Sequence, residues 1–407
     1  MSHKIAILHQ GFIPLYRVAF YQRLNQLGPD RYVVFHGKPP AHSGHYELPL
    51  AIDFPNVWVR NMTLSMAGYD VIYQSVLRAI LSGSYDAVVV GHELKFLSNM
   101  FLFLLFKMMR KPVLFWGHGF NKQQERVLDG GRVAATIGKL KGALARWADH
   151  YLVYSEGGAQ SVMQLGMPSD KITVIRNTLD MEEQRVLYET FQSADPIELR
   201  RHTPLRSDSL VLLYVGRMYK EKHLEEALEV VRRVNGEHLC PTPIELVMIG
   251  DGPELERLRT LGTDLQAVHF LGEIYDQAVI AQYMRLASAM IIPGKVGLVA
   301  NHALSHGLPV MTRAHARHAP EVEYIESGYN GLIVEGDFDA FLHAVVGYLK
   351  SPERQLAMSE AALATRQTLT LEFMAAGFQR AVQQALGVAE PKRAVVREPD
   401  NRWAMGG

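Results

Sequence analysis

The sequence predicts an α/β protein built from two doubly wound domains. Three observations support this prediction. The chain has 407 residues, more than one hydrophobic core normally supports. Short apolar segments alternate with helix-like segments in both halves, as in parallel sheets covered by helices. A polar, charged stretch over residues 181–209 interrupts this alternation and is a plausible domain boundary.

The first half contains six short apolar segments that are typical of buried strands, and helix-like segments such as YRVAFYQRLNQLG lie between several of them. The expected strands are KIAILH, YVVFHG, AVVVGH, PVLFWGHG, HYLVYS and ITVIRN. We expect a Rossmann-like domain over residues 1–190.

The alternation restarts at residue 210 and predicts a second Rossmann-like domain over residues 205–385, followed by a polar tail over 386–407. The expected strands are LVLLYVGR, IELVMIGDG, VHFLGE, AMIIPG, PVMTR and GLIVEGD, with helices over HLEEALEVVRRVNG and PELERLRTLG. Two such domains are expected to face a central cleft, with ligands at the carboxyl ends of the strands.

Composition excludes several classes of protein. Apolar residues make up 48% of the chain and charged residues 21%, as in ordinary globular proteins. The net charge is zero, so no nucleic-acid partner is expected. Cys240 is the one cysteine, which excludes an intramolecular disulfide and favours the cytoplasm. The N-terminal segment is interrupted too soon to be a signal peptide and instead predicts a buried strand.

Two segments raise the question of membrane contact. The stretch FLSNMFLFLLFKMMRKPVLFW is interrupted by Lys107 and Arg110, short of the ~20 residues that a spanning helix needs. It predicts a buried helix between two strands, with a membrane-dipping surface as the alternative. The stretch GRVAATIGKLKGALARWA is a basic amphipathic helix, either a solvated face or a surface for anionic lipid; its cations are Arg132, Lys139, Lys141 and Arg146.

Cations follow the first strand of the second half. Gly216 and Arg217 end this strand, and Lys222 stands five residues after Arg217. Arginine and lysine in this position can converge on a phosphate, although a pair of ordinary surface cations is the alternative. The next strand ends in a tight turn, GDGP, with Pro253 placed to begin a helix. The chain has no Walker A loop, and no G-x-G-x-x-G motif follows its first strand.

The loop PGKVGLVANHALSHGLPV runs from an apolar strand into an expected helix. Such a geometry suits an anion, because the amides at a helix start are unpaired and the helix dipole favours negative charge there. The segment contains His302 and His306 and no carboxylate.

Taken together, these pieces resemble glycosyltransferase family 4, the retaining enzymes with the GT-B fold. The run from Leu210 to Asp337 is similar to the family's donor-binding domain, with its motifs in the same order. The resemblance implies that Arg217 and Lys222 hold the diphosphate of a nucleotide-sugar, UDP or GDP, and that Tyr275 lies against the base. The other donor-binding residues it implies are Gly216, Gly294, Lys295, Val296, Gly297, Leu298, Val299 and His302.

The first half resembles the family's acceptor domain. GFIPLYRVAFYQRL is similar to the opening loop and helix, and implies acceptor contacts by Gly11, Tyr16 and Arg17. LFWGHG is similar to the strand with the active-site histidine, which implies that His118 touches the donor sugar. A buried, hydrogen-bonded histidine at a strand end is the alternative for His118.

The loop departs from the family pattern, which places two glutamates eight positions apart. Aligned on GLV, these positions are Gly294 and His302. A neutral histidine has one donor and one acceptor, so His302 can still bond a ribose hydroxyl. Gly294 has no side chain that could take the place of the first glutamate, whereas Lys295 can place charge near the leaving phosphate. Similar PGxVGL loops in bacterial polysaccharide enzymes favour a variant site over a dead one.

The resemblance implies metal-independent transfer of a sugar, with retention, to a saccharide or lipid-linked acceptor in bacterial surface polysaccharide synthesis. No Asp-x-Asp motif is placed to hold a metal, and the histidines lack a ligand pattern. No cofactor is expected besides the co-substrate, and peripheral contact with the inner face of the cytoplasmic membrane is a further expectation. The alternatives are a degenerate protein that binds without turnover and an isomerase like the nucleotide-sugar 2-epimerases, whose acidic catalytic residues this loop lacks.

Overall fold

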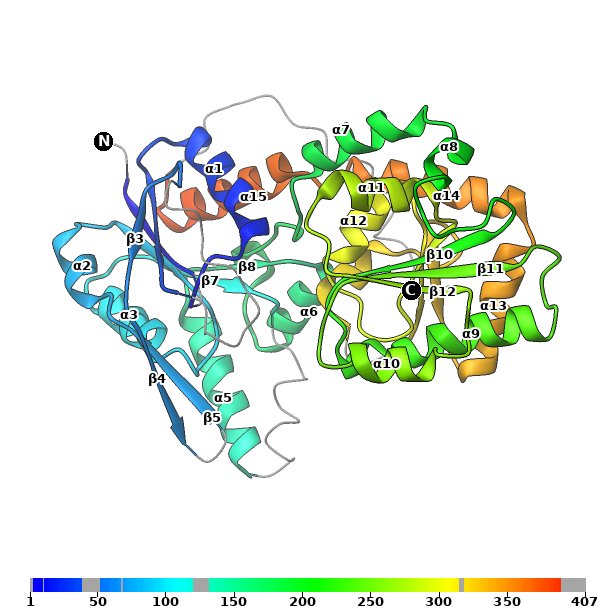
Figure 1. Cartoon of the computed structure of the whole chain (residues 1–407). Helices are drawn as coiled ribbons and strands as arrows, with labels where there is room; N and C mark the ends of the chain where they lie inside the picture. The colour runs from blue at the N-terminus through cyan, green and yellow to red at the C-terminus, as the bar shows by residue number, and fades with distance from the viewer. Residues whose placement is uncertain are drawn as a thin grey trace. The chain divides into compact units, whose positions relative to one another are not determined.

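The chain divides into two compact units in its computed structural model, which describes residues 3–9, 11–38, 52–66, 69–119, 132–314 and 318–388. Unit 1 comprises residues 1–177 together with 371–407, and unit 2 comprises residues 178–370. Each unit is built on a parallel sheet covered by helices, so the predicted α/β class with two Rossmann-like halves is confirmed (Figure 1).

Unit 1 contains a seven-stranded parallel sheet in the order β3-β2-β1-β6-β7-β8-β9. Its central strands are buried on both faces, as their continuous apolar sequences predict. Alternate residues supply two cores, one under α1 and α15 and the other under α2, α3 and α6. The strands are β1 (Ile5–Leu8), β2 (Tyr32–His36), β3 (Asn56–Trp58), β6 (Ala87–Val90), β7 (Val113–Gly117), β8 (His150–Val153) and β9 (Ile172–Val174). The helices are α1 (Val18–Leu27), α2 (Leu77–Ser82), α3 (Leu97–Met108), α5 (Arg132–Trp147), α6 (Glu156–Gln164) and α15 (Leu371–Ala385).

Helix α15 belongs to unit 1 and not to the second domain, in which it was expected from the sequence. It packs against α1 and the sheet of unit 1 (Figure 1). The centre of the Phe378 ring lies 5.6 Å from that of Phe20 and 5.3 Å from that of Trp116. The expected domain 205–385 therefore loses its last helix, because the apolar face of α15 completes the core of the first sheet. Residues 389–407 of the expected tail lie outside the described residues.

The expected boundary stretch over 181–209 begins with two helices of unit 2, α7 (Met181–Gln192) and α8 (Pro196–Arg200). Gln184 of α7 is buried and accepts a hydrogen bond from Nε2 of His306 (3.1 Å). Residues 178–190, expected in the first domain, thus belong to the second unit.

Unit 2 contains a six-stranded parallel sheet in the order β12-β11-β10-β13-β14-β15. The strands are β10 (Leu210–Val215), β11 (Ile244–Ile249), β12 (Val268–Gly272), β13 (Ala289–Ile291), β14 (Val310–Arg313) and β15 (Gly331–Val334). Besides α7 and α8, the helices are α9 (Leu224–Gly236), α10 (Leu255–Leu261), α11 (Gln277–Leu286), α12 (Val299–Ser305), α13 (Phe338–Leu349) and α14 (Pro352–Arg366).

Three features of unit 1 differ from what the sequence predicts. The edge strand β3 was not among the expected strands. An antiparallel hairpin, β4 (Asn61–Met66) and β5 (Tyr69–Gln74), stands apart from the main sheet. Helix α3, expected to be buried, is buried on one face and exposes Phe101 (54%), Leu104 (47%) and Met108 (76%) on the other. Across the described part of the chain, every helix is too short or too polar to cross a membrane.

Candidate functional site

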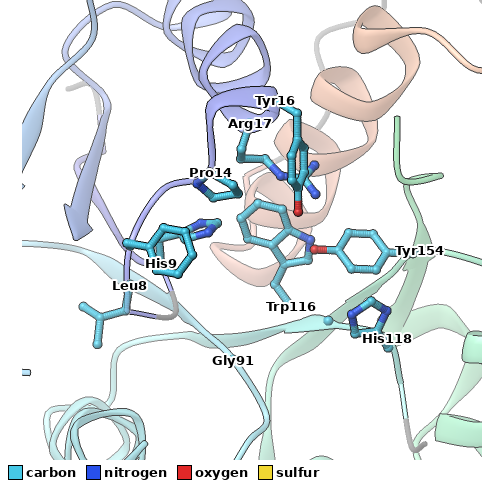
Figure 2. A pocket seen from close by; sticks show the side chains of 11 residues that line it. Leu8, His9, Pro14, Tyr16, Arg17, Gly91, Trp116, His118 and Tyr154 are labelled. Carbon is cyan, nitrogen blue, oxygen red and sulfur yellow. The ribbon is translucent and has the colours of Figure 1, made fainter. Parts of the chain in front are cut away.

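A cavity of about 240 Å³, here called the unit 1 cavity, lies at the carboxyl ends of β1, β6, β7 and β8 (Figure 2). Parallel strands end at the same edge of a sheet, so residues far apart in the sequence meet there. The cavity brings together the predicted residues Tyr16, Arg17 and His118. Its lining consists of Leu8, His9, Phe12, Pro14, Tyr16, Arg17, Gly91, Trp116, Gly117, His118 and Tyr154.

Arg17 places a buried cation on the wall of this cavity, with 2% of its surface exposed. Its Nη2 donates to Oδ1 of Asn177 (2.5 Å), and its Nη1 lies 3.5 Å from the Met374 sulfur. The guanidinium carbon lies 5.5 Å from the centre of the Trp116 ring and 5.7 Å from that of Tyr154 (Figure 2). Aromatic faces attract a desolvated cation, so these contacts hold the guanidinium at the cavity.

Three further residues of the cavity were not singled out in the sequence: His9, Trp116 and Tyr154. Burial, and then the charge of Arg17, lowers the pKa of His9 to about 3, so its ring is neutral; its Nδ1 lies 2.6 Å from the Tyr21 hydroxyl. The buried indole Nε1 of Trp116 has no hydrogen-bond partner within the described chain. A buried N–H group without a partner is suited to donate a hydrogen bond to a ligand. Their positions in the sequence could have indicated them, because His9 directly follows β1, Tyr154 directly follows β8 and Trp116 is the last residue but one of β7.

His118 is exposed at the end of β7, and its ring contacts Tyr154 edge-on with centroids 5.0 Å apart. This exposure argues against the alternative of a buried structural histidine. Gly119 follows with φ +78°, and a β-carbon on it would lie 2.6 Å from the Gly158 carbonyl oxygen. The turn after β7 therefore requires glycine, because both its backbone conformation and its close packing on α6 exclude a side chain.

In unit 2, the ends of β10, β11 and β12 are joined by backbone hydrogen bonds. Gly216 N–H donates to Ile249 O (3.0 Å), and Gly250 N–H donates to Gly272 O (2.7 Å). Gly250 has φ +133°, and a β-carbon on it would lie 2.0 Å from the Gly216 carbonyl oxygen. This contact requires glycine at 250 and brings the Gly216–Arg217 turn beside the GDGP turn, as the sequence motifs predict.

Arg217 directly follows Gly216, and its guanidinium carbon lies 5.5 Å from the centre of the Tyr219 ring. Its buried Nε has no hydrogen-bond partner among the described residues. Because a buried N–H normally has a partner, and because guanidinium groups match phosphate oxygens, this atom is a candidate phosphate donor.

Lys222 stands in a 3-10 turn, Lys220–Lys222, beside the loop that the sequence singled out. Its Nζ donates to the carbonyl oxygen of Lys295 (2.6 Å). Burial, and then the charge of Lys295, lowers the pKa of Lys222 to about 8, while the buried Glu321 opposes this shift. Two cations that repel one another at the end of a sheet are suited to an anionic ligand. Glu321 was not anticipated from the sequence.

The same loop is fastened to this turn through its backbone. Gly294 N–H donates to Lys222 O (2.9 Å), and Lys295 N–H donates to Glu221 O (2.7 Å). Val296 N–H donates to Nδ1 of His318 (3.1 Å), so this amide, expected to meet phosphate or sugar, already has a partner. Helix α12 supplies no partners for the amides of the next three residues, Gly297, Leu298 and Val299.

His302 lies on α12 with 9% of its surface exposed, and burial lowers its pKa to about 4. Its ring is therefore neutral, and its buried Nε2 has no hydrogen-bond partner in the described structure. The His306 ring lies 5.7 Å away, with its own Nε2 bonded to Gln184. The predicted bond from His302 to a ribose stays a prediction.

Tyr275 follows β12 and precedes α11, with 55% of its surface exposed. Gly11, predicted to contact the acceptor, lines a second cavity of unit 1. Within the described residues, no group of three or more His, Cys, Asp or Glu side chains is arranged to hold a metal ion.

Comparison with known proteins gives the family. The family described as Glycosyltransferase Family 4 matches residues 16–183, and that described as Glycosyl transferases group 1 matches residues 209–351. The D-inositol 3-phosphate glycosyltransferase of Acidothermus cellulolyticus is 29% identical over 187 residues, which cover 43% of this chain and 41% of that protein. The lipopolysaccharide 1,6-galactosyltransferase of Salmonella typhimurium is 24% identical over 206 residues, covering 48% and 51%. The chain thus spans about half the length of these relatives.

The fold is also that of known glycosyltransferase structures. Anabaena HepE in complex with UDP superposes with a TM-score of 0.69 at 17% identity, covering 93% of this chain and 99% of HepE. Its complex with UDP-glucose gives a TM-score of 0.67 at 18% identity, covering 95% and 100%. The two family matches lie in chain order on the two parallel sheets. The chain belongs to the glycosyltransferases of family 4, with the GT-B fold.

Proposed function

We propose that the protein transfers a sugar, with retention of configuration, from a UDP- or GDP-linked donor to a saccharide or lipid-linked acceptor. The observation that carries this proposal is the contact of the Lys222 ammonium with the Lys295 carbonyl oxygen, which joins the loops after β10 and β13 at the carboxyl edge of the second sheet. Arg217 follows β10 at the same edge. It is supported by the relatives, which are named as glycosyltransferases, and by HepE, whose structures contain UDP and UDP-glucose.

The chemistry requires stabilisation of a leaving nucleoside diphosphate. Arg217, Lys222 and Lys295 supply positive charge to it, so no metal ion is needed. The bond from the sugar C1 to the phosphate oxygen breaks, and the bond from C1 to the acceptor oxygen forms on the same face. The acceptor proton passes to an oxygen of the departing diphosphate. In this proposal His118 touches the donor sugar, His302 the ribose and Tyr275 the base.

The acceptor sugar binds in the unit 1 cavity, against Tyr16, Arg17 and Trp116. Aromatic walls with a few polar groups are typical of small-molecule sites. One relative acts on lipopolysaccharide, which supports a role in bacterial surface polysaccharide synthesis.

We further propose that the enzyme works on the inner face of the cytoplasmic membrane. The exposed side chains of Phe101, Leu104 and Met108 form a stripe on one face of α3, here called the α3 stripe. Helix α5 lies beside α3, with the Trp147 and Phe103 rings 5.4 Å apart. Residues 97–119 and 132–148 contain lysines and arginines and no Asp or Glu, which complements anionic lipid. Of these cations, Lys107 is ion-paired with Asp149 (3.0 Å).

The function is tested by thermal-shift binding of UDP-, GDP- and CMP-sugars, followed by transfer assays with and without acceptor. Arg217→Ala or Lys222→Ala is expected to lower transfer by roughly 10²-fold or more, since each group stabilises developing charge. Arg259→Ala, an exposed arginine on α10, is the control and should keep full activity. Full activity in Arg217→Ala contradicts the assignment. Binding without turnover indicates a degenerate protein, and conversion of the sugar without acceptor indicates an isomerase.

A further inference from the structure

A second cavity of unit 1, about 640 Å³ and open to solvent, lies beside the first; we call it the cationic groove. Its described lining consists of Gly11, Phe12, Lys38, Trp58, Arg60, Asn61, Thr63, Ile72, Lys95 and Phe96. Lys38 follows β2, Trp58 ends β3 and Lys95 follows β6, so the groove lies at the same sheet edge as the unit 1 cavity. Phe12 lines both cavities, which are therefore neighbours.

All charged side chains in the described lining of the groove are cations. Its lining contains three cations, Lys38, Arg60 and Lys95, and no Asp or Glu among its described residues. Lys95 has an ion pair with Glu93, with Nζ 2.9 Å from the carboxylate, and Glu93 is not part of this lining. Like charges in a concave, partly apolar surface reinforce one another's field, because the low-dielectric walls screen less than water does.

The shape of the groove is held by backbone contacts around Asn61. The Asn61 amide Nδ2 donates to the carbonyl oxygens of Gly11 (3.0 Å) and Lys38 (3.3 Å). Gly37 N–H donates to the same Gly11 oxygen (2.6 Å). These bonds join the loops after β1 and β2 to the start of β4, so the backbone beside Lys38 and Arg60 is positioned before a ligand arrives.

Aromatic side chains complete the lining. Trp58 is 55% exposed and lines the groove, whereas Phe96 is buried and lies under Lys95, with Nζ 5.3 Å from the ring centre. A groove whose described lining has cations, an exposed tryptophan and no acid suits an organic anion better than a free cation or a neutral chain.

We propose that the cationic groove binds a negatively charged group, phosphate or carboxylate, carried by the acceptor whose sugar occupies the unit 1 cavity. This inference rests on the proposed function, because it assigns the acceptor to unit 1. It names the acceptor class: an anionic saccharide, either a sugar phosphate or an acidic sugar. Arg60 and Lys95 determine this specificity through charge.

The test uses three probes, glucose, glucuronic acid and glucose 1-phosphate, with dissociation constants from ligand-detected NMR at 50 mM salt. The full-length Arg217→Ala chain is used, so that phosphate binding at the donor cations is weakened. The anionic probes should bind roughly tenfold tighter than glucose, a preference that two partly exposed cations can supply. Arg60→Gln/Lys95→Gln should remove the preference, and 0.5 M salt should reduce it. Arg259→Gln/Lys350→Gln, exposed cations of unit 2, is the matched control and should keep it.

Stronger binding of glucose 1-phosphate than of glucuronic acid assigns a phosphate, and the reverse order assigns a carboxylate. Equal binding of glucose and both anions, or a preference that survives in Arg60→Gln/Lys95→Gln, overturns the proposal. Nucleotide-sugar binding is measured separately on Arg60→Gln/Lys95→Gln with Arg217 intact. If neither Arg60→Gln/Lys95→Gln nor the wild type binds a nucleotide-sugar, the result counts against the proposed function. If nucleotide-sugars bind but the anionic probes are not preferred over glucose, the result counts against the groove alone.

Discussion

Gly294 lies so close to the turn before α9 that a β-carbon on it would stand 2.2 Å from the carbonyl oxygen of Glu221. The Lys222 carbonyl carbon would lie 2.6 Å away, and Gly294 N–H already donates to Lys222 O. At this position the family usually has a glutamate. Packing against the Glu221–Lys222 backbone leaves no room for a glutamate side chain here, and the next residue, Lys295, is held by its own N–H bond to Glu221 O.

This packing predicts that Gly294→Ala lowers the free energy of unfolding by about 1–3 kcal/mol, the usual scale for overpacking. Chemical denaturation monitored by fluorescence measures the change. Gly347→Ala is the matched control, since Gly347 is exposed on α13 with nothing within 4 Å of its added β-carbon. It should be neutral or stabilise the protein by up to ~1 kcal/mol. Equal destabilisation by both substitutions would refute the packing argument.

The lowered pKa of Lys222 predicts a pH-dependent donor affinity. Its pKa is about 8 in the free protein, so the ammonium is mostly charged at pH 7 and mostly neutral at pH 9. Affinity for the nucleotide-sugar should therefore fall as pH rises through 8. A bound diphosphate favours the charged form, so binding near pH 8.5 should take up a fraction of a proton. Calorimetry in two buffers with different ionisation heats measures this uptake.

The control for this experiment is Lys222→Arg, which keeps its charge throughout this range. It should show no proton uptake between pH 7 and 9. Uptake that is unchanged in Lys222→Arg would assign the titration to another group.

His302 is predicted to bond the donor ribose through its neutral ring. His302→Ala should weaken nucleotide-sugar affinity about tenfold, or ~1–1.5 kcal/mol, the scale of one neutral hydrogen bond. The matched control is His306→Ala, a second buried histidine, directly after the same helix, whose Nε2 is already bonded to Gln184. It should leave the affinity unchanged. Titration calorimetry with the cognate donor compares them, and wild-type affinity in His302→Ala would show that His302 only fills space.

Buried histidines predict a loss of stability in acid. Burial lowers the pKa of His150 from 6.5 to about 4, so the unfolded chain binds more protons than the folded chain between these values. Stability is therefore greatest above pH 6.5 and falls as pH decreases towards 4. At pH 5 the loss from this residue is about 2 kcal/mol relative to pH 7. His150→Gln should reduce the difference in unfolding free energy between pH 7 and pH 5 by that amount.

The exposed His343→Gln is the control and should leave the pH difference as in the wild type. Urea unfolding at pH 5 and pH 7 gives the unfolding free energy of the wild type, His150→Gln and His343→Gln. The same pH difference in His150→Gln and wild type would contradict a neutral, buried His150.

The α3 stripe predicts binding to anionic vesicles. The wild-type chain should float with phosphatidylglycerol vesicles and float less as salt increases, because charge attraction is screened within ~10 Å at 0.1 M. Phe101→Ser/Met108→Ser should lower the floated fraction several-fold, since these side chains bury apolar surface in the interface. Leu356→Ser removes an equally exposed apolar side chain from α14 and serves as control. Flotation that is unaffected by the stripe substitutions would place any membrane contact elsewhere.

Much of the fold could be predicted from local sequence. The twelve apolar segments assigned as strands correspond to β1, β2, β6–β9 and β10–β15, because strands buried on both faces are continuously apolar. The motifs proposed to bind phosphate were also local, since Gly216, Arg217 and the GDGP turn stand at the ends of such strands. Strand β3 was missed because it is only three residues long, and the hairpin β4–β5 was missed because polar residues such as Asn61, Thr63 and Ser65 interrupt its apolar sequence.

The sequence by itself determined that this chain has two parallel sheets, where most of their strands lie and which cations follow them. Only the tertiary structure decided that α15 returns to the first sheet, that Gly294 must lack a side chain, and that Arg17 lies against Trp116 and Tyr154. The physical reason is that apolar periodicity records how much of a segment is buried. It does not record which surface covers it, and close approaches such as that of Gly294 to Glu221 exist only once distant backbones have packed together.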